Sequence, residues 1–148
     1  MLIYNILQVL LLLLLGLSTL YIFIFSLAGL FYRQKKYAAS GTLRKIAVLI
    51  PGYKEDEVII EVAAEALKQD YPADRYDVVI IADSFEKETL VKLGSMPIKL
   101  IEVSFDKSTK SKALNKAMSQ LTGAYDIAVV LDADNVMATD FLHKINTA

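Results

Sequence analysis

Two aspartates, Asp132 and Asp134, stand one residue apart directly after the apolar run at positions 127–131. Carboxylates at this spacing can share one hard divalent cation, or they can divide between a cation and a sugar hydroxyl. Proteins commonly hold Mg²⁺ with one or two carboxylates together with the phosphates of a substrate. The pair therefore predicts a metal-assisted site for a phosphorylated ligand, with a solvated or helix-capping acidic turn as the alternative.

The apolar run 127–131 has the length and composition of a strand that is buried on both faces. In an open α/β sheet, ligands bind just beyond the carboxyl ends of the strands. A strand that ends at Asp132 therefore places both carboxylates at the edge of the sheet where a ligand would bind.

Apolar and β-branched runs alternate with helical patterns through the rest of the globular part. This alternation predicts an α/β fold, with a Rossmann-like, doubly wound and mainly parallel sheet that is covered by helices. Right-handed crossovers and the usual strand order 3-2-1-4 place the first and fourth strands side by side. We expect Thr139 to be the N-cap of the last helix. The expected strands are 45–50, 76–82, 98–103 and 127–131, and the expected helices are 57–69, 86–93, 111–121 and 139–145.

Turns after three of these strands then meet around one crevice. The loop 51–57 follows the first strand, Asp83 ends the second, and the loop 132–135 follows the fourth. Because parallel strands end at the same edge, acidic side chains from all three turns converge there. The acidic positions are Glu55, Asp83, Asp132 and Asp134.

Phosphates at this crevice would need a cation and basic side chains, because the sequence has neither the glycine fingerprint of dinucleotide-binding folds nor a P-loop. Lys110 and Lys112 lie at the start of the helix predicted at 111–121. The amino end of a helix with lysine beside it suits an anion, and a solvated basic turn is the alternative.

The N-terminal segment 1–34 is apolar and contains one charged residue, Arg33. A helix of about 20 apolar residues spans a bilayer, so the segment is long enough for an uncleaved transmembrane anchor. A cleavable signal peptide, the alternative, would need a basic start and a shorter apolar core. Basic residues follow the segment and none precedes it, so the positive-inside rule predicts a cytoplasmic globular part.

The length and the net charge of the chain limit the number of domains and the classes of partner. The chain has 148 residues, enough for one globular domain, and it contains no cysteine. A net charge of −1 argues against a nucleic-acid partner, which would need a clustered basic face. We expect a transmembrane anchor at 1–34, a linker at 35–44 and a globular part at 45–148.

Four short motifs follow one another through the globular part. They are Pro51-Gly52-Tyr53-Lys54-Glu55, Ile81-Ala82-Asp83-Ser84, Lys110-Ser111-Lys112-Ala113-Leu114-Asn115 and Asp132-Ala133-Asp134. Together they resemble the family 2 glycosyltransferases, which have the A-type nucleotide-sugar fold. The membrane-attached synthases of cellulose, hyaluronan and poly-N-acetylglucosamine look most similar. The resemblance extends over essentially the whole globular part, including the segment 69–83.

The resemblance implies how a nucleotide sugar would bind. Tyr53 would lie against the nucleotide base, in the loop that begins at Pro51 and is supported by Glu55. Asp83 would accept a hydrogen bond from the base, typically uracil, and Lys110 would lie near the ribose or the diphosphate.

The resemblance also implies a metal site and a reaction. Asp132 would contact the ribose or the metal, and Asp134 would bind the Mg²⁺ or Mn²⁺ ion that bridges the diphosphate. The reaction would be the inverting, metal-dependent transfer of a sugar from a UDP-sugar to a saccharide or lipid-linked acceptor. It would serve cell-surface polysaccharide synthesis at the inner (plasma) membrane, with membrane lipid around the anchor.

The chain departs from the family pattern in three ways. Lys54 stands where asparagine is common, and Glu88 stands where a second aspartate is common; both look like tolerable surface changes. The general base and the acceptor-binding motif of the family would lie beyond Ala148, and His143 is expected to be a surface or partly buried residue rather than a substitute base. We therefore expect the donor-binding N-terminal portion of a longer enzyme, with an incomplete sheet and no transferase activity of its own.

Two other interpretations stay open. A non-enzymatic, membrane-tethered α/β module could bind a cation or a regulatory ligand, as receiver-like domains do. That interpretation explains the acidic rim, but it explains neither the motif at 51–55 nor the lysine segment at 110–115. The chain could also be an inactive fragment without a function in the cell.

Overall fold

The computed structural model describes residues 1–32 and 41–147, and contacts within the chain divide it into two compact units, Met1–Lys36 and Tyr37–Ala148. Residues 33–40 contain Arg33, Lys35 and Lys36, which are three of the basic side chains behind the topology prediction, and the first part of the predicted linker. These residues lie outside the described part of the chain. The boundaries expected after residues 34 and 44 therefore stay predictions.

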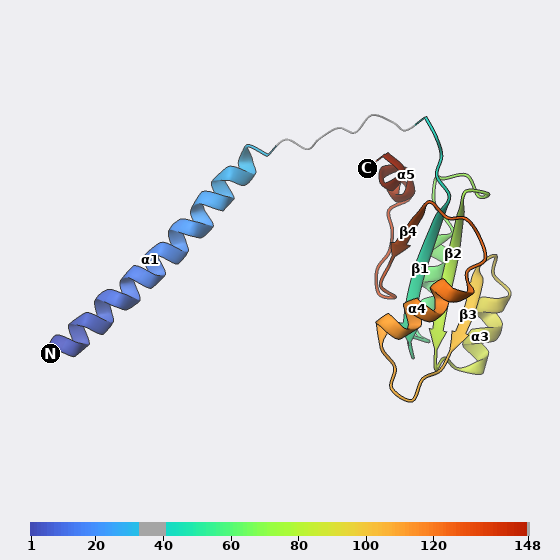
Figure 1. Ribbon diagram of the computed structural model, residues 1–148, viewed down its shortest axis with the longest axis horizontal. Coiled ribbons are helices and arrows are strands. Elements are labelled where there is room, and N and C mark those ends of the chain that lie inside the picture. Colours follow the sequence, from blue (N-terminus) through green and yellow to red (C-terminus); the bar gives the residue numbers. More distant parts are fainter. Residues whose placement is uncertain (33–40, 148) are drawn as a thin grey trace. The chain divides into compact units, whose positions relative to one another are not determined.

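Most of the first unit is one long helix, α1 (Leu2–Leu30), in which no residue is buried (Figure 1). Its residues rise about 44 Å along the axis, which exceeds the hydrocarbon core of a bilayer, about 30 Å. The hydroxyl of Thr19 donates to the carbonyl of Leu15 at 2.8 Å, so this polar group is satisfied inside the helix, as lipid requires. By length and composition, α1 could span a membrane.

The second unit is built on a parallel sheet in the order β3-β2-β1-β4 (Figure 1). Isoleucine, valine and leucine dominate the two central strands, β1 and β2, which suits strands that helices cover on both faces. The predicted parallel sheet and strand order are confirmed. The strands are β1 (Ile46–Tyr53), β2 (Tyr76–Asp83), β3 (Lys99–Val103) and β4 (Ile127–Val130).

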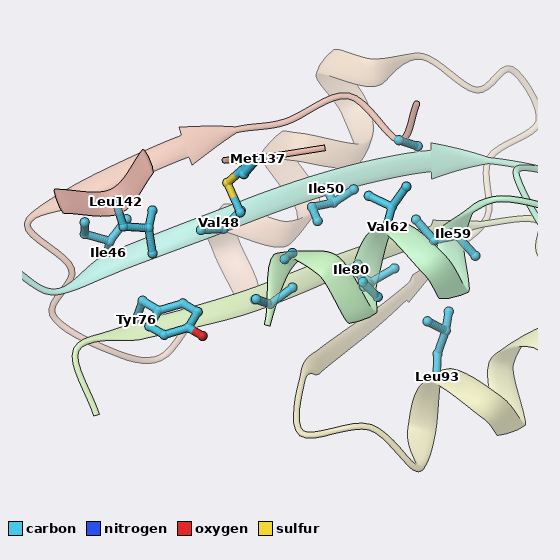
Figure 2. Packing of buried hydrophobic residues seen from close by; sticks show 14 of the residues in the cluster. Ile46, Val48, Ile50, Ile59, Val62, Tyr76, Ile80, Leu93, Met137 and Leu142 are labelled. Carbon is cyan, nitrogen blue, oxygen red and sulfur yellow. The ribbon is translucent and has the colours of Figure 1, made fainter. Parts of the chain in front are cut away.

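Helices pack on both faces of this sheet, as expected for a doubly wound fold. Successive residues of a strand face opposite sides. Val48 and Ile50 of β1 therefore lie in one core with side chains of α2, α3 and α5 (Figure 2), whereas Ala47 and Leu49 lie in a second core with side chains of α4. The helices are α2 (Ile59–Ala66), α3 (Lys87–Gly94), α4 (Lys110–Gln120) and α5 (Phe141–Thr147).

β4 is less buried than the sequence predicts. It is an edge strand, and its Ala128 and Val130 side chains are exposed, the latter by 48%. Both share a face with Ala47 and Leu49, and α4 packs over β1, β2 and β3 on that face. The prediction of a strand buried on both faces is wrong for the described residues, because apolar composition does not reveal which neighbours will cover a strand.

The last helix also begins later than predicted. α5 starts at Phe141, so Thr139 is not its N-cap. The carbonyl of Thr139 instead accepts a hydrogen bond from the backbone N–H of Asp70 at 2.8 Å, a partner that local sequence does not reveal. His143 lies on α5 and is exposed, as expected.

Candidate functional site

The chain turns sharply at the carboxyl ends of β1 and β2. Tyr53 and Asp83, the last residues of these strands, are partners in the parallel register, and the N–H of Lys54 donates to the carbonyl of Asp83 at 3.1 Å. The next residues have left-handed backbones, with φ of 55° at Lys54 and 59° at Ser84. Such conformations cost about 1 kcal/mol for residues other than glycine, and they concentrate at functional sites.

Asp83 lies at the base of these turns and is only 1% exposed. Its Oδ1 accepts a hydrogen bond from the hydroxyl of Ser84 at 3.0 Å, and its Oδ2 accepts one from the hydroxyl of Ser108. A buried carboxylate needs such donors, because burial without them is costly. Neutral hydroxyls rather than a basic side chain therefore hold this carboxylate in place.

Five of the predicted site residues line one pocket of about 190 Å³ at this edge of the sheet. The pocket lies between the turn after β1, the end of β2 and the start of α4. The predicted residues are Pro51, Tyr53, Glu55, Asp83 and Lys110, and the other lining residues are Gly52, Ser108, Thr109 and Ala113. The fold thus brings together three segments that lie far apart in the sequence.

A larger hollow, about 720 Å³, lies beside this pocket and shares Glu55 with it. It is formed by the turns that precede α2 and α3, and its lining contains five carboxylates and two lysines. The excess of negative charge would repel a diphosphate. The smaller pocket is therefore the better candidate for a phosphorylated ligand.

Tyr53 and Gly52 shape the β1 side of the smaller pocket. The Tyr53 side chain is 52% exposed, and the ammonium of Lys54 lies 5.4 Å from the centre of its ring. An exposed ring beside a pocket offers a flat surface to a planar ligand. At Gly52, an added Cβ would come within 2.7 Å of the Phe85 ring, so a larger residue there would force this ring to move.

Lys110 connects the pocket to the Asp132–Asp134 loop. It is the first residue of α4, whose N-cap Thr109 accepts a hydrogen bond from the backbone N–H of Lys112 at 3.3 Å. The Lys110 ammonium forms an ion pair with Oδ1 of Asp132, and both side chains are about half exposed. An anion that entered the pocket would meet this same ammonium and the amino end of α4.

Asp134 is exposed and stands outside the lining of the pocket. Its neighbours Ala133 and Met137 are buried, which anchors the loop while both aspartates stay at the surface. Within residues 1–32 and 41–147, no group of three or more acidic, histidine or cysteine side chains could hold a metal ion. A hard cation here would take Asp132 and Asp134 from the chain and its other oxygens from a ligand and water, which fits Mg²⁺ or Mn²⁺ beside phosphates.

Three hydroxyl residues of this region are not among the predicted site residues: Ser108 and Thr109, and Ser84, which is named from the sequence only as part of a motif. Thr109 could have been found, because threonine is a preferred N-cap and α4 starts only one residue before the predicted helix. Ser108 gives no local signal, since its partner Asp83 lies 25 residues away in the sequence.

Comparison with known proteins places the globular unit among sugar-transferring enzymes. Residues 44–148 match the family described as Glycosyltransferase like family 2. Probable glycosyltransferase YdaM of Bacillus subtilis is 31% identical over an alignment of 100 residues, which covers 63% of this chain and 23% of that protein. Beta-monoglucosyldiacylglycerol synthase of Trichormus variabilis is 30% identical over an alignment of 136 residues, which covers 86% of this chain and 28% of that protein. The chain thus spans under a third of these relatives.

A solved structure gives the same fold. The mannosyltransferase PcManGT of Pyrobaculum calidifontis, in complex with GDP-Man and Mn²⁺, aligns with a TM-score of 0.61 at 25% identity. The alignment covers 77% of this chain and 36% of that protein. The four-stranded parallel sheet and its helices therefore form a substructure that a larger mannosyltransferase also contains.

Proposed function

The chain belongs to family 2 of the glycosyltransferases, and we propose that it is the donor-binding portion of an enzyme that transfers a sugar from a UDP-sugar. The observation that carries the proposal is the pocket at the carboxyl edge of the sheet, which Tyr53, Asp83 and Lys110 line together. The metal dependence and the inversion at the sugar carbon are parts of the proposal that the family resemblance implies.

Asp83 is the proposed partner of the nucleotide base. Asp83 lines the pocket, and the hydroxyls of Ser84 and Ser108 hold its carboxylate, whose oxygens have further lone pairs that would accept a hydrogen bond from a planar base. Uracil offers an N–H group at N3, and the exposed ring of Tyr53 can stack against its face. Both features support uridine as the nucleoside of the donor.

Lys110 and the amino end of α4 are the proposed partners of the diphosphate, and Asp132 and Asp134 would hold Mg²⁺ or Mn²⁺. A cation bound there neutralises the negative charge that develops on the departing nucleoside diphosphate. Donor binding would replace the ion pair between Lys110 and Asp132. Lys110 would then contact phosphate, and Asp132 would contact the ribose or the cation. The ion pair supports this exchange because it holds Asp132 beside Lys110, which lines the pocket.

The proposal extends to the organisation of the chain at a membrane. Segment 1–34 would anchor the protein, and segment 35–44 would link the anchor to the globular part. The globular part, 45–148, would lie on the cytoplasmic side of the plasma membrane. The length and apolar surface of α1 support the anchor. The relative named beta-monoglucosyldiacylglycerol synthase supports a lipid-linked acceptor, and the resemblance to polysaccharide synthases supports a saccharide.

Isothermal titration calorimetry of the chain in detergent micelles tests the donor site. UDP should bind in the presence of Mn²⁺, GDP should bind more weakly, and EDTA should abolish the binding of UDP. Binding of UDP that is unchanged by EDTA would contradict the metal-dependent site. Uptake of Mn²⁺ with no binding of UDP would support the cation-binding module instead.

A further inference from the structure

Gln69 joins the end of α2 to the segment that follows the Asp132–Asp134 loop. Its Nε2 donates to the carbonyl of Ala138 at 3.0 Å, and its Oε1 accepts a hydrogen bond from the N–H of Leu142 at 3.2 Å. The backbone N–H of Asp70 adds a third hydrogen bond, to the carbonyl of Thr139 at 2.8 Å. We call these three bonds the Gln69 clamp.

The clamp acts on a segment with little regular structure of its own. Between the end of β4 and the start of α5, residues 131–140 form turns and irregular chain, without a helix or strand. Within it, Ala133 and Met137 are buried, and Leu142 follows at 0% exposure; Figure 2 shows Met137 and Leu142 beside β1. Two buried side chains and the clamp therefore fix the backbone that carries both exposed aspartates.

The chemistry of the clamp requires an amide side chain. Gln69 is 8% exposed, and it uses both ends of its amide group, one as donor and one as acceptor. Glutamate would keep the acceptor but lose the donor, and an apolar side chain would lose both. A side chain that only filled space at this position would need neither a donor nor an acceptor. The amide of Gln69 instead matches the carbonyl and the N–H group that it binds.

We propose that Gln69 is a positioning residue for the metal-binding loop, because its clamp sets where the carboxylate of Asp134 stands when a cation and a diphosphate bind. This inference rests on the proposed function. Groups that orient metal ligands without touching the metal commonly change metal affinity by about 10- to 100-fold when they are removed. We therefore expect that substitution of Gln69 weakens the binding of UDP in the presence of Mn²⁺.

Tyr71 offers a matched control two residues away. Its hydroxyl donates to the carbonyl of Arg44 at 2.8 Å and contacts Oδ1 of Asn146 at 3.2 Å. These bonds tie the end of α5 to the chain before β1 and do not reach residues 138–142 directly. Tyr71→Phe thus removes a buried polar contact of similar strength but leaves the Gln69 clamp in place.

The experiment compares Gln69→Met, Tyr71→Phe and the unsubstituted chain in detergent micelles. Calorimetry measures the affinity for UDP with Mn²⁺, NMR measures the binding of uridine without metal, and thermal unfolding reports stability. Gln69→Met should weaken Mn²⁺-dependent UDP binding by about tenfold and leave uridine binding unchanged. Tyr71→Phe should lower the melting temperature and change neither affinity.

The results distinguish failure of the proposed function from failure of the positioning role alone. If the unsubstituted chain shows no Mn²⁺-dependent binding of UDP, the proposed function falls and this inference falls with it. If the unsubstituted chain binds and Gln69→Met binds equally well, only the positioning role is overturned. Equal losses of UDP and uridine affinity, or the same loss in Tyr71→Phe, would overturn it too. Should Gln69→Met fail to fold, Gln69→Glu, which keeps the acceptor for Leu142, is judged by the same outcomes.

Discussion

The two edges of the sheet use similar side chains in different ways. At the amino edge, Oδ2 of Asp77 accepts hydrogen bonds from the Tyr125 hydroxyl at 2.7 Å and from Lys99 Nζ at 3.1 Å, and Lys45 Nζ lies 3.8 Å away. We call Lys45, Asp77, Lys99 and Tyr125 the amino-edge cluster. At the carboxyl edge, Asp83 is held by hydroxyls beside an open pocket. At the amino edge the carboxylate is bound by side chains of the protein, whereas at the carboxyl edge it lies beside the pocket that the predicted site residues line.

The carboxylate of the amino-edge cluster is compensated within the protein, because two lysines and a tyrosine hydroxyl face it. Burial raises the pKa of Asp77, but hydrogen bonds from Tyr125 and Lys99 and the charges of two lysines outweigh burial and hold this pKa below its ordinary value. The hydrogen bond with Tyr125 and the contact with Asp77 raise the pKa of Lys99 despite its partial burial. The cluster thus stabilises the fold by ion pairing.

The comparison shows that a carboxylate beside a lysine does not define a ligand site. Both edges contain that pair, as Asp77 with Lys99 and as Asp132 with Lys110. Among the described residues, the pair at the carboxyl edge lies beside left-handed turns, the amino end of a helix and the pocket that five predicted site residues line. Those features come from the ends of parallel strands, where α/β folds bind their ligands.

We expect the largest effect from Asp134→Asn, which should weaken ligand binding at the carboxyl edge. Loss of a charged oxygen ligand should lower the Mn²⁺-dependent affinity for UDP by more than about a hundredfold, beyond the usual loss for an outer-shell group. Calorimetry measures this affinity. Asp77→Asn is the control and should bind UDP as the unsubstituted chain does, so equal losses in both variants would refute the distinction between the edges.

Asp77→Asn should show the opposite pattern, a loss of stability without a loss of binding. Replacing charge-assisted hydrogen bonds by neutral ones should lower the free energy of unfolding by about 1–2 kcal/mol. Urea unfolding followed by tyrosine fluorescence measures it. The exposed Asp134→Asn should change the same quantity by less than about 0.5 kcal/mol. A larger loss in Asp134→Asn than in Asp77→Asn would reverse the assignment of roles.

Acid should weaken the fold through the amino-edge cluster. The pKa of Asp77 in the folded chain lies below its ordinary value of 3.8, so the folded state binds fewer protons than the unfolded state. This contribution to stability is present above the ordinary pKa, and it is lost as the pH falls through the lower folded pKa. Urea midpoints measured as the pH is lowered through this acid range should decrease less steeply in Asp77→Asn. Parallel profiles would contradict the prediction.

Lys54→Asn should have the smallest effect on the free energy of unfolding, and it should increase this free energy rather than lower it. Asparagine tolerates the left-handed backbone found at Lys54, so the free energy of unfolding should rise by less than about 1 kcal/mol. Ser84→Asn is the matched variant, and its gain should be cancelled because the hydrogen bond from Ser84 to Asp83 is lost. Urea unfolding compares the two. A loss in Lys54→Asn would mean that the contact of its ammonium with Tyr53 matters more than the backbone.

The sequence by itself determined the features that local patterns encode. The apolar run gave α1, and the alternation of apolar strands with amphipathic helices gave the parallel sheet and its strand order. The pattern also placed Asp83 at the end of a strand, because it follows directly after a buried apolar run. Tyr53 was expected in the loop 51–57, but β1 continues through Pro51 and Gly52 and ends at Tyr53. The other predictions succeed because they rest on properties of consecutive residues.

Only the tertiary structure decided which distant groups meet. The hydroxyl of Ser108 on Asp83, the clamp of Gln69 on Ala138 and the hydrogen bond of Asp70 to Thr139 each join residues many positions apart. The exposure of β4 likewise depends on where α4 packs. A side chain's donors and acceptors are known from its type, but their partners are fixed only when packing brings the segments together.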